Sequence, residues 1–238
     1  MHYAPRQKVE GLTLSRVVGR KGTTTSRKGD CSGVMHYALT HFKIMKVAIV
    51  KYNAGNIQSV IYALNRLGID PLLTDNVEEL KSADKVLFPG QGEASNAMTY
   101  LKARGLDTVI RELKQPVLGI CIGQQLLCMH SEENDTDCLG IIPARVKKFP
   151  PKDKIPQIGW NTITDLKGNL FKGIQENSYV YFVHSYYVEP NPYQIATADY
   201  ILPYACAFQK DNFYAVQFHP EKSSDIGSKI LENFIEMK

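Results

Sequence analysis

Beginning at residue 45, short apolar runs alternate with stretches in which apolar residues recur at helical spacing. Residues 46–50 form a short apolar run, which is followed by a polar loop at 53–56. From residue 57 to 67 apolar side chains return every three or four positions, until Gly68 interrupts them. The first run is typical of a buried strand and the second of an amphipathic helix. The segment therefore predicts a strand followed by a helix.

The same order recurs twice further along the chain. Residues 85–88 predict a strand that Pro89 and Gly90 break, and a helix follows over 93–102. Residues 116–120 predict another strand, with a helix over 124–130 soon after it. Repeated units of strand, loop and helix are typical of an α/β domain with a mostly parallel, doubly wound sheet.

The second half of the chain has a different pattern. Four β-rich runs are separated by Asn, Pro and Gly, and they cover residues 179–183, 194–198, 204–209 and 213–218. An amphipathic helix is predicted over 225–237. Because neither a linker nor an internal repeat is visible after residue 45, we predict one domain over 45–238, in which an antiparallel portion extends the parallel sheet.

Residues 1–44 lack sustained periodicity and have a charge of their own. They contain eight basic and two acidic residues, a net charge of +6, whereas the whole chain has +4. The rest of the chain is therefore slightly acidic and has no basic stripe that would indicate a nucleic-acid partner. The stretch has no apolar segment of a secretory signal. Its composition also fits an organellar transit peptide, but we expect a basic, disordered extension before the domain.

Composition narrows the class of protein further. With 44% hydrophobic and 22% charged residues the chain is typical of globular proteins. No apolar run approaches the ~20 residues of a membrane helix, so we expect no membrane partner. The five cysteines are irregularly spaced and form no metal-binding pair, which predicts neither a disulfide scaffold nor a metal site. We expect a cytoplasmic protein with no cofactor and at least one free cysteine.

The first candidate for chemistry is Gly-Ile-Cys-Ile-Gly at residues 119–123, where a predicted strand runs into a helix. The glycines permit the sharp turn that lifts a nucleophile into a cleft at the end of a strand. The positive end of the helix dipole favours the thiolate form of Cys121. A buried structural cysteine would fit this short motif equally well.

Two further segments supply partners for a nucleophile. His219 follows a predicted strand, and Glu221 stands two residues later. An imidazole can act as the base for Cys121, and a carboxylate can fix the tautomer of the ring. The glycine loop at 88–92 follows another parallel strand, and its backbone N–H groups can stabilise an oxyanion. An ordinary turn between strand and helix would also explain that loop.

Together these segments resemble the class I (triad) glutamine amidotransferases, and within them the glutaminase subunits of imidazole glycerol phosphate synthases of histidine biosynthesis. The resemblance extends over 45–238 and is carried by residues 53–56, 88–90, 118–127, 139–142, 159–161, 181–186 and 217–223. It implies a single class I amidotransferase domain with a cysteine nucleophile elbow. It also implies hydrolysis of L-glutamine to glutamate and ammonia.

The resemblance assigns roles to individual residues. Cys121 attacks the glutamine amide to form a thioester, His219 transfers the protons and Glu221 orients the imidazole. The positions that match the oxyanion hole and the glutamine-binding residues of the family are Gly90, Gln91, Gly92, Ile122, Gln125, Glu133, Ser185 and Tyr186.

The resemblance also implies a partner. In the family, ammonia passes to a cyclase subunit, a (β/α)8 barrel that makes imidazole glycerol phosphate and an aminoimidazole carboxamide ribotide. We therefore expect a heterodimer, with an interface at Asn53, Trp160, Tyr181 and Lys222. Trp160 lies in a predicted polar loop, where an interface anchor and a core tryptophan are both compatible with the sequence.

Two departures from the family keep alternatives open. Gln91 and Gln124 stand where most relatives have Val and Met, and Ile122 replaces a Leu. The chain could instead be a paralogous glutaminase that supplies ammonia to a sugar amidotransferase in surface-polysaccharide synthesis. A stand-alone Cys–His hydrolase and an inactive binding module are weaker alternatives, since the first needs no partner and the second needs no intact triad.

Overall fold

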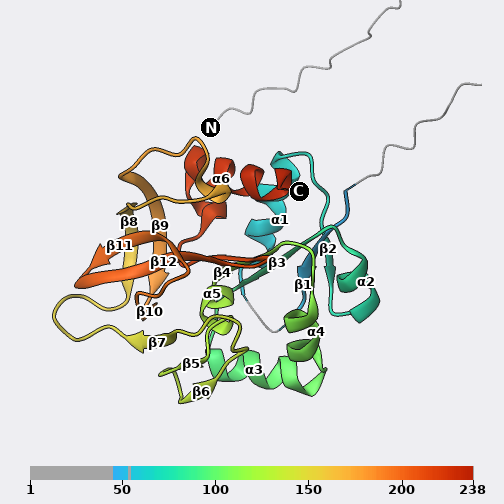
Figure 1. Cartoon of the computed structure of the whole chain (residues 1–238), viewed down its shortest axis with the longest axis horizontal. Helices are drawn as coiled ribbons and strands as arrows, with labels where there is room; N and C mark the ends of the chain where they lie inside the picture. The colour runs from blue at the N-terminus through green and yellow to red at the C-terminus, as the bar shows by residue number, and fades with distance from the viewer. Residues whose placement is uncertain (1–44, 53–54, 238) are drawn as a thin grey trace, which may run out of the picture. The chain divides into compact units, whose positions relative to one another are not determined.

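The computed structural model describes residues 45–52 and 55–237, and its sheet has a parallel half and an antiparallel half (Figure 1). In the parallel half the strands follow the order β2-β1-β3-β4. The elements of this half are β1 (Val47–Val50), α1 (Ile57–Arg66), β2 (Leu72–Thr74), α2 (Val77–Ser82), β3 (Lys85–Gly90), α3 (Ala94–Ala103), α4 (Leu106–Glu112), β4 (Val117–Cys121) and α5 (Ile122–Leu126).

The antiparallel half joins the parallel half through β13, which pairs parallel with β4 and antiparallel with β12. Beyond β12 the sheet continues with β10, β7, β5 and β6, while β11 also pairs with β12. The remaining elements are β5 (His130–Ser131), β6 (Thr136–Asp137), β7 (Arg145–Lys148), β8 (Gln157–Ile163), η1 (Asn169–Phe171), β9 (Ser178–His184), β10 (Tyr186–Val188), β11 (Gln194–Tyr200), β12 (Leu202–Lys210), β13 (Phe213–Val216), η2 (Pro220–Lys222) and α6 (Ser224–Glu236).

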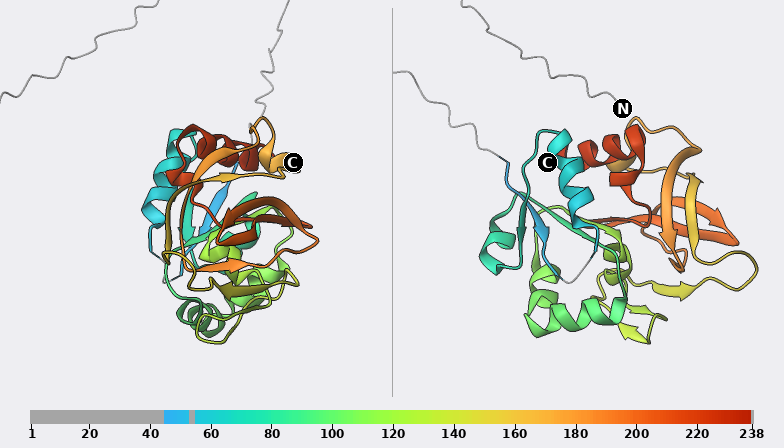
Figure 2. Two further views of the ribbon diagram at one scale, coloured as in Figure 1. Left: turned by 90° about the vertical axis from the view of Figure 1, so that its left-hand side faces the viewer. Right: turned by 180° about the vertical axis from the view of Figure 1, so that it is seen from behind.

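Strands β8 and β9 form a separate antiparallel pair outside the main sheet. Figures 1 and 2 show this pair and β11 at one end of the described domain, with β2 at the other end. The pair packs against β11 through β8 and against α6 through β9.

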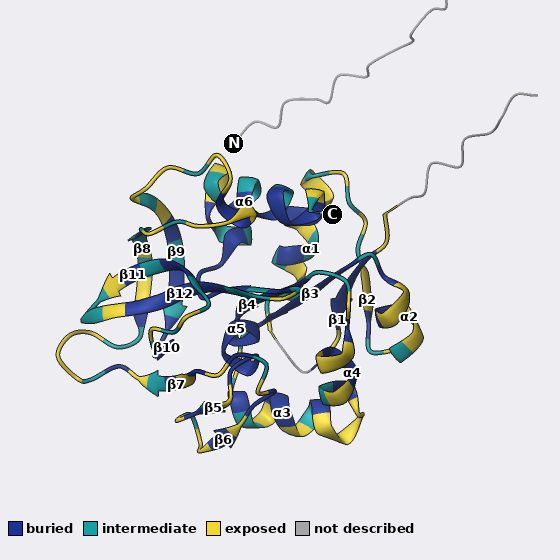
Figure 3. Ribbon diagram, viewed as in Figure 1, coloured by how far each residue is buried: buried dark blue, intermediate teal, exposed yellow. Residues whose placement is uncertain are grey.

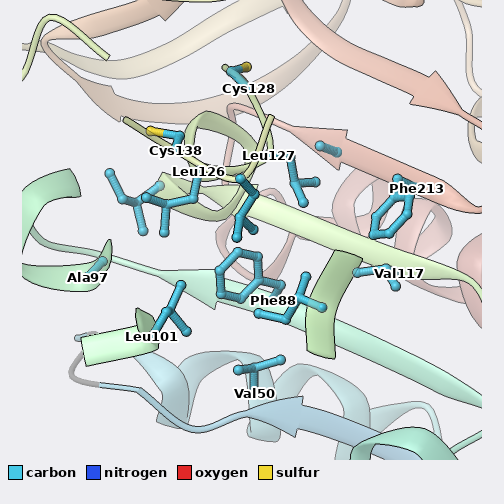
Figure 4. Close-up of a cluster of buried hydrophobic side chains, with 14 of the residues drawn as sticks. Val50, Phe88, Ala97, Leu101, Val117, Leu126, Leu127, Cys128, Cys138 and Phe213 are labelled. Atoms are coloured by element: carbon cyan, nitrogen blue, oxygen red, sulfur yellow. The ribbon is translucent and has the colours of Figure 1, made fainter. Parts of the chain in front are cut away.

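Helices cover both faces of the sheet, and the strands supply two apolar cores (Figure 3). Because side chains alternate along a strand, Ala48 and Val50 join the core beneath α2–α5, while Val47 and Ile49 join the core beneath α1 and α6. Figure 4 shows part of the first core, in which Phe88 lies among aliphatic side chains of several elements. The predicted doubly wound sheet with an antiparallel extension is confirmed.

The C-terminal ends of the parallel strands lie at one edge of the sheet. Gly90, the last residue of β3, pairs with Cys121, the last residue of β4. Val216 at the end of β13 pairs with Ile120 on the other side of β4. Residues that follow these three strands therefore gather at one edge, which is where open α/β sheets bind their ligands.

Two sequence-based element boundaries are wrong. The strand over 85–88 is not broken by Pro89, because β3 continues to Gly90. Its partner β1 pairs only as far as Leu87, so the missing N–H of Pro89 removes no ladder bond on that side. The helix predicted over 124–130 begins at Ile122 and ends at Leu126. After it the Met129 N–H donates to the Ala144 carbonyl, which draws the chain into β5.

The other predicted helices over 57–67, 93–102 and 225–237 correspond to α1, α3 and α6 within two residues at each end. Within the described ranges, no helix has the length and apolar character needed to cross a membrane. The basic extension predicted over residues 1–44 lies outside the described residues.

Candidate active site

Cys121 occupies the sharp junction between β4 and α5. It is the N-cap of α5 with φ 55° and ψ −109°, a backbone conformation that residues with a side chain rarely adopt. Such strain costs on the order of 1–3 kcal/mol, and it persists where the surrounding structure enforces it. The sulfur is almost buried, 3.8 Å from the Val183 carbonyl oxygen. The predicted nucleophile elbow is therefore present as a strained turn.

The glycines around Cys121 are required by close packing. A Cβ on Gly123 would lie 1.7 Å from the carbonyl oxygen of Phe88 in β3. A Cβ on Gly119 would lie 2.9 Å from the backbone of Gly123. Glycine at both positions lets the first turn of α5 rest directly on the strands, which holds the elbow in place.

The predicted base and its orienting carboxylate are buried together. His219 Nδ1 lies 2.7 Å from Glu221 Oε1, and both side chains are at most 2% exposed. Asn56 Nδ2 donates to the same carboxylate oxygen at 2.9 Å. The His219 Nε2 atom is buried without a hydrogen-bond partner among the described residues, so it is the ring atom left for the Cys121 thiol. The geometry therefore matches a Cys–His–Glu triad.

Electrostatics favour a charged imidazole at this site. Burial lowers the pKa of His219, but the charge of Cys121 and the hydrogen bonds to Cys121 and Glu221 outweigh burial and raise the pKa to about 10. A protonated ring next to the sulfur stabilises a thiolate. The pair can therefore exist as thiolate and imidazolium, which is the reactive form of a cysteine nucleophile.

A cavity of about 320 Å³ opens beside Cys121. That volume is at the small end of the range for small-molecule sites. Seven of the eight predicted oxyanion and glutamine-binding residues line it, namely Gln91, Gly92, Ile122, Gln125, Glu133, Ser185 and Tyr186. The eighth, Gly90, lines a separate smaller cavity of about 150 Å³ together with His219 and Glu221.

The cavity holds groups of complementary polarity. Glu133 Oε2 accepts a hydrogen bond from the Ala94 N–H at 2.7 Å, and burial raises the pKa of this carboxyl. Gln125 Nε2 donates to the Tyr186 carbonyl oxygen at 3.2 Å. A carboxylate at one position and a fixed side-chain amide at another can hold the charged and polar ends of an amino acid.

Sequence analysis missed several residues of the site. Asn56, which holds Glu221, lies 165 residues away from it in sequence. Pro156, Val183 and His184 line the cavity without having been predicted. The segments that contain Asn56, Val183 and His184 had been recognised as motifs, but no local pattern shows which side chain of a motif points into a cavity.

Comparison with known proteins identifies the family. Residues 48–237 match the sequence profile of the family described as Glutamine amidotransferase class-I. The protein of Bacteroides fragilis named imidazole glycerol phosphate synthase subunit HisH is 56% identical over 196 residues, which cover 81% of this chain and all of that protein. The chain belongs to the class I glutamine amidotransferase family.

Further relatives support the same group within the class I amidotransferases. The HisH subunit of Pasteurella multocida is 43% identical over 195 residues, which cover 81% of this chain and 98% of that protein. A solved glutamine amidotransferase of Thermotoga maritima superposes with a TM-score of 0.57 at 16% identity, over 80% of this chain and 82% of that one. That similarity concerns the fold alone. The HisH relatives confirm the subfamily expected from the sequence and do not favour the sugar amidotransferase alternative.

The predicted interface residues lie on β8 and β9 of this amidotransferase, as far as they are described. Trp160 pairs with Tyr181 across the two strands, and the Lys222 Nζ lies 6.0 Å from the centre of the Tyr181 ring. Trp160 is in strand β8 and not in a loop, because its backbone is paired with β9. Its side chain is 52% exposed, which excludes a core tryptophan. Asn53 lies outside the described residues.

Proposed function

We propose that the chain hydrolyses L-glutamine at Cys121 as the glutaminase subunit of an imidazole glycerol phosphate synthase. The observation that carries the proposal is the strained Cys121 elbow beside the buried His219–Glu221 pair, at the mouth of a small-molecule cavity. The HisH names of the relatives support the choice of synthase. The protein would act in the cytoplasm, in keeping with its cysteines, none of which is paired among the described residues.

The reaction follows from the positions of the three side chains. The Cys121 thiolate attacks the side-chain carbonyl carbon of glutamine, and the carbonyl electrons move to oxygen. Backbone N–H groups at Gly92 and Ile122 are the candidates to stabilise that oxyanion, since both residues line the cavity. The His219 imidazolium gives its proton to the amide nitrogen, ammonia leaves and a thioester remains. Water, deprotonated by His219, then releases glutamate and regenerates the thiolate.

We further propose that the exposed face of β8 and β9 docks a cyclase subunit of (β/α)8-barrel fold. Ile158, Trp160 and Tyr179 lie on this face and are 59%, 52% and 60% exposed. Exposed aromatic and aliphatic side chains in one patch are typical of a protein interface. Val183 lies on the same face of the pair and lines the cavity beside Cys121, so a partner docked here would lie close to the site where ammonia forms.

Glutamine hydrolysis by the full chain tests the proposal, measured alone and with a cyclase subunit plus its nucleotide substrate. Wild-type activity is expected to rise with the partner, and Cys121→Ala to reduce it to background in both conditions. Residual hydrolysis by Cys121→Ala would refute the nucleophile assignment. Cys121-dependent activity that the cyclase subunit leaves unchanged would refute the partner.

The docking face has its own test. Trp160→Ala is expected to weaken binding to the cyclase subunit by about 2 kcal/mol or more, as truncation of an aromatic anchor does. Tyr62→Ala, which removes an equally exposed aromatic from α1, is the matched control. Equal affinities for the wild type and the Trp160 variant, measured by calorimetry, would exclude this face as the interface.

A further inference from the structure

Gln217 is a fully buried amide next to the nucleophile, in the segment that links β13 to His219. It is 0% exposed, and its backbone N–H donates to the Cys206 carbonyl at 2.8 Å. Its side chain reaches two groups of the site. The Gln217 Oε1 accepts from Gln125 Nε2 at 2.9 Å, and the Gln217 Nε2 lies 3.7 Å from Cys121 Sγ.

The orientation of this amide is fixed by a backbone group. Gln125 Nε2 faces the Tyr186 carbonyl oxygen, which can only accept, so this end of the Gln125 amide must be the nitrogen. The same nitrogen faces Gln217, so the facing atom of Gln217 must be its oxygen. The Gln217 NH2 group is therefore the end that faces the sulfur of Cys121.

The two polar neighbours of Cys121 Sγ distinguish its protonation states. The Val183 carbonyl oxygen, 3.8 Å from the sulfur, can accept from a thiol but gains nothing from a thiolate. The Gln217 NH2 group donates to a thiolate and has no comparable interaction with the thiol proton. A hydrogen bond to a charged acceptor is stronger than one to a neutral acceptor, and burial increases the difference.

We propose that Gln217 is a positioning residue that stabilises the thiolate of Cys121 and at the same time holds Gln125 for the substrate. The proposal rests on Cys121 as the nucleophile of the proposed function. Its NH2 end acts on the sulfur, and its oxygen end fixes the amide of Gln125 at the cavity wall. One buried side chain thus couples the protonation state of the nucleophile to the arrangement of the binding site.

The other titratable groups that face Cys121 stay in place when Gln217 is changed. His219, with Glu221 behind it, lies on one side of the thiolate. Tyr52 is the second, and burial raises the pKa of its hydroxyl well above the ordinary value, so the hydroxyl stays neutral. A change in the pH dependence of Cys121 reactivity therefore reports on the Gln217 amide.

Alkylation of Cys121 by iodoacetamide measures this effect directly on the full chain. The thiolate sulfur forms a bond to the methylene carbon and iodide leaves, so the rate follows the thiolate fraction. Gln217→Met keeps the approximate size and removes both polar ends. We expect the midpoint of its alkylation profile against pH to rise by about one unit, which is about tenfold in rate at neutral pH. Mass spectrometry of the Cys121 peptide gives the rate.

Gln217→Glu separates the two ends of the side chain. It keeps an oxygen for Gln125 but places a carboxylate instead of a donor beside the sulfur. We expect an upward shift of the midpoint at least as large as in Gln217→Met, with the KM for glutamine near the wild-type value. In Gln217→Met we expect KM to rise several-fold as well, because Gln125 loses its partner.

Gln209→Met is the matched control, since it removes a half-buried glutamine of β12 that donates to the Tyr214 hydroxyl. Thermal unfolding identifies any variant that does not fold. Unchanged midpoints in both folded Gln217 variants would overturn the proposal. Alkylation reads the thiol itself, so the result stands even if Cys121→Ala retained glutamine hydrolysis and thereby refuted the proposed function.

Discussion

Two buried histidines near Cys121 have opposite electrostatic environments. His219 has Glu221 and Cys121 as partners, and these raise its pKa to about 10 against the effect of burial. Burial lowers the pKa of His184 to about 4, because its partners are all neutral. Its Nδ1 lies 2.7 Å from the Tyr186 carbonyl oxygen, and its Nε2 faces the Gln157 amide and the Tyr204 hydroxyl.

The comparison shows that burial does not decide the charge of a histidine at this site. Two ionisable partners make His219 a proton carrier, whereas neutral partners make His184 a structural hydrogen-bonding group. The Tyr186 carbonyl that His184 binds is also the one that fixes Gln125. His184 therefore shapes the cavity without taking part in proton transfer.

The largest expected effect comes from removing the charged histidine. His219→Asn is expected to reduce kcat for glutamine hydrolysis by about 10³- to 10⁴-fold, because both the thiolate and the leaving ammonia lose their proton partner. His184→Asn is expected to reduce kcat by about tenfold at most, because a neutral positioning group is lost. Equal losses in the two variants would contradict the division of roles.

A second change removes the charge and keeps the shape. Glu221→Gln is expected to reduce kcat by about 10²- to 10³-fold, since the amide orients the ring less well and no longer stabilises its charge. The pKa of His219, followed by NMR, should fall in this variant. Glu232→Gln, which alters an exposed ion pair of α6 with Lys229, serves as the control and should leave both quantities unchanged. A pKa of His219 that stays at the wild-type value would contradict the role of Glu221.

The neutral histidine predicts a loss of stability in acid. Between pH 6.5 and 4 the unfolded chain binds a proton at His184 that the folded chain does not bind. Stability from this group is therefore complete above pH 6.5 and falls by about 3 kcal/mol as the pH approaches 4. Urea unfolding across this range measures the loss. His184→Gln should show a correspondingly smaller decrease, and parallel curves for the two proteins would refute the assignment.

The smallest effect sharpens the description of His184. Tyr204→Phe removes the hydroxyl that lies 3.2 Å from His184 Nε2 and 3.1 Å from Gln157 Oε1. The expected cost is about 1 kcal/mol of unfolding free energy, the usual value for a buried neutral hydrogen bond. Tyr214→Phe, at a half-buried hydroxyl on β13, is the comparison variant. Urea unfolding should find the Tyr204 variant less stable than the Tyr214 variant; the reverse order would be evidence against the network.

Local sequence was sufficient where a feature depends on neighbours in the chain. The periodicity of residues 57–67 predicts α1 because helical spacing directs one apolar face toward the sheet. Gly-x-Cys-x-Gly predicts the elbow because only glycine permits α5 to start so close to β3. The helix expected over 124–130 failed because long-range pairing with Ala144 competes with the helix after Leu126.

The sequence by itself determined the alternation of strands and helices, the cysteine elbow and the family, since each depends on short segments. Only the tertiary structure decided which side chains meet, such as Asn56 with Glu221 across 165 residues and Gln217 with Cys121 across 96. It also decided the opposite pKa shifts of His219 and His184. The physical reason is that hydrogen bonds and desolvation depend on distances of a few ångströms, which are set by how β4, β13 and β9 pack around the site.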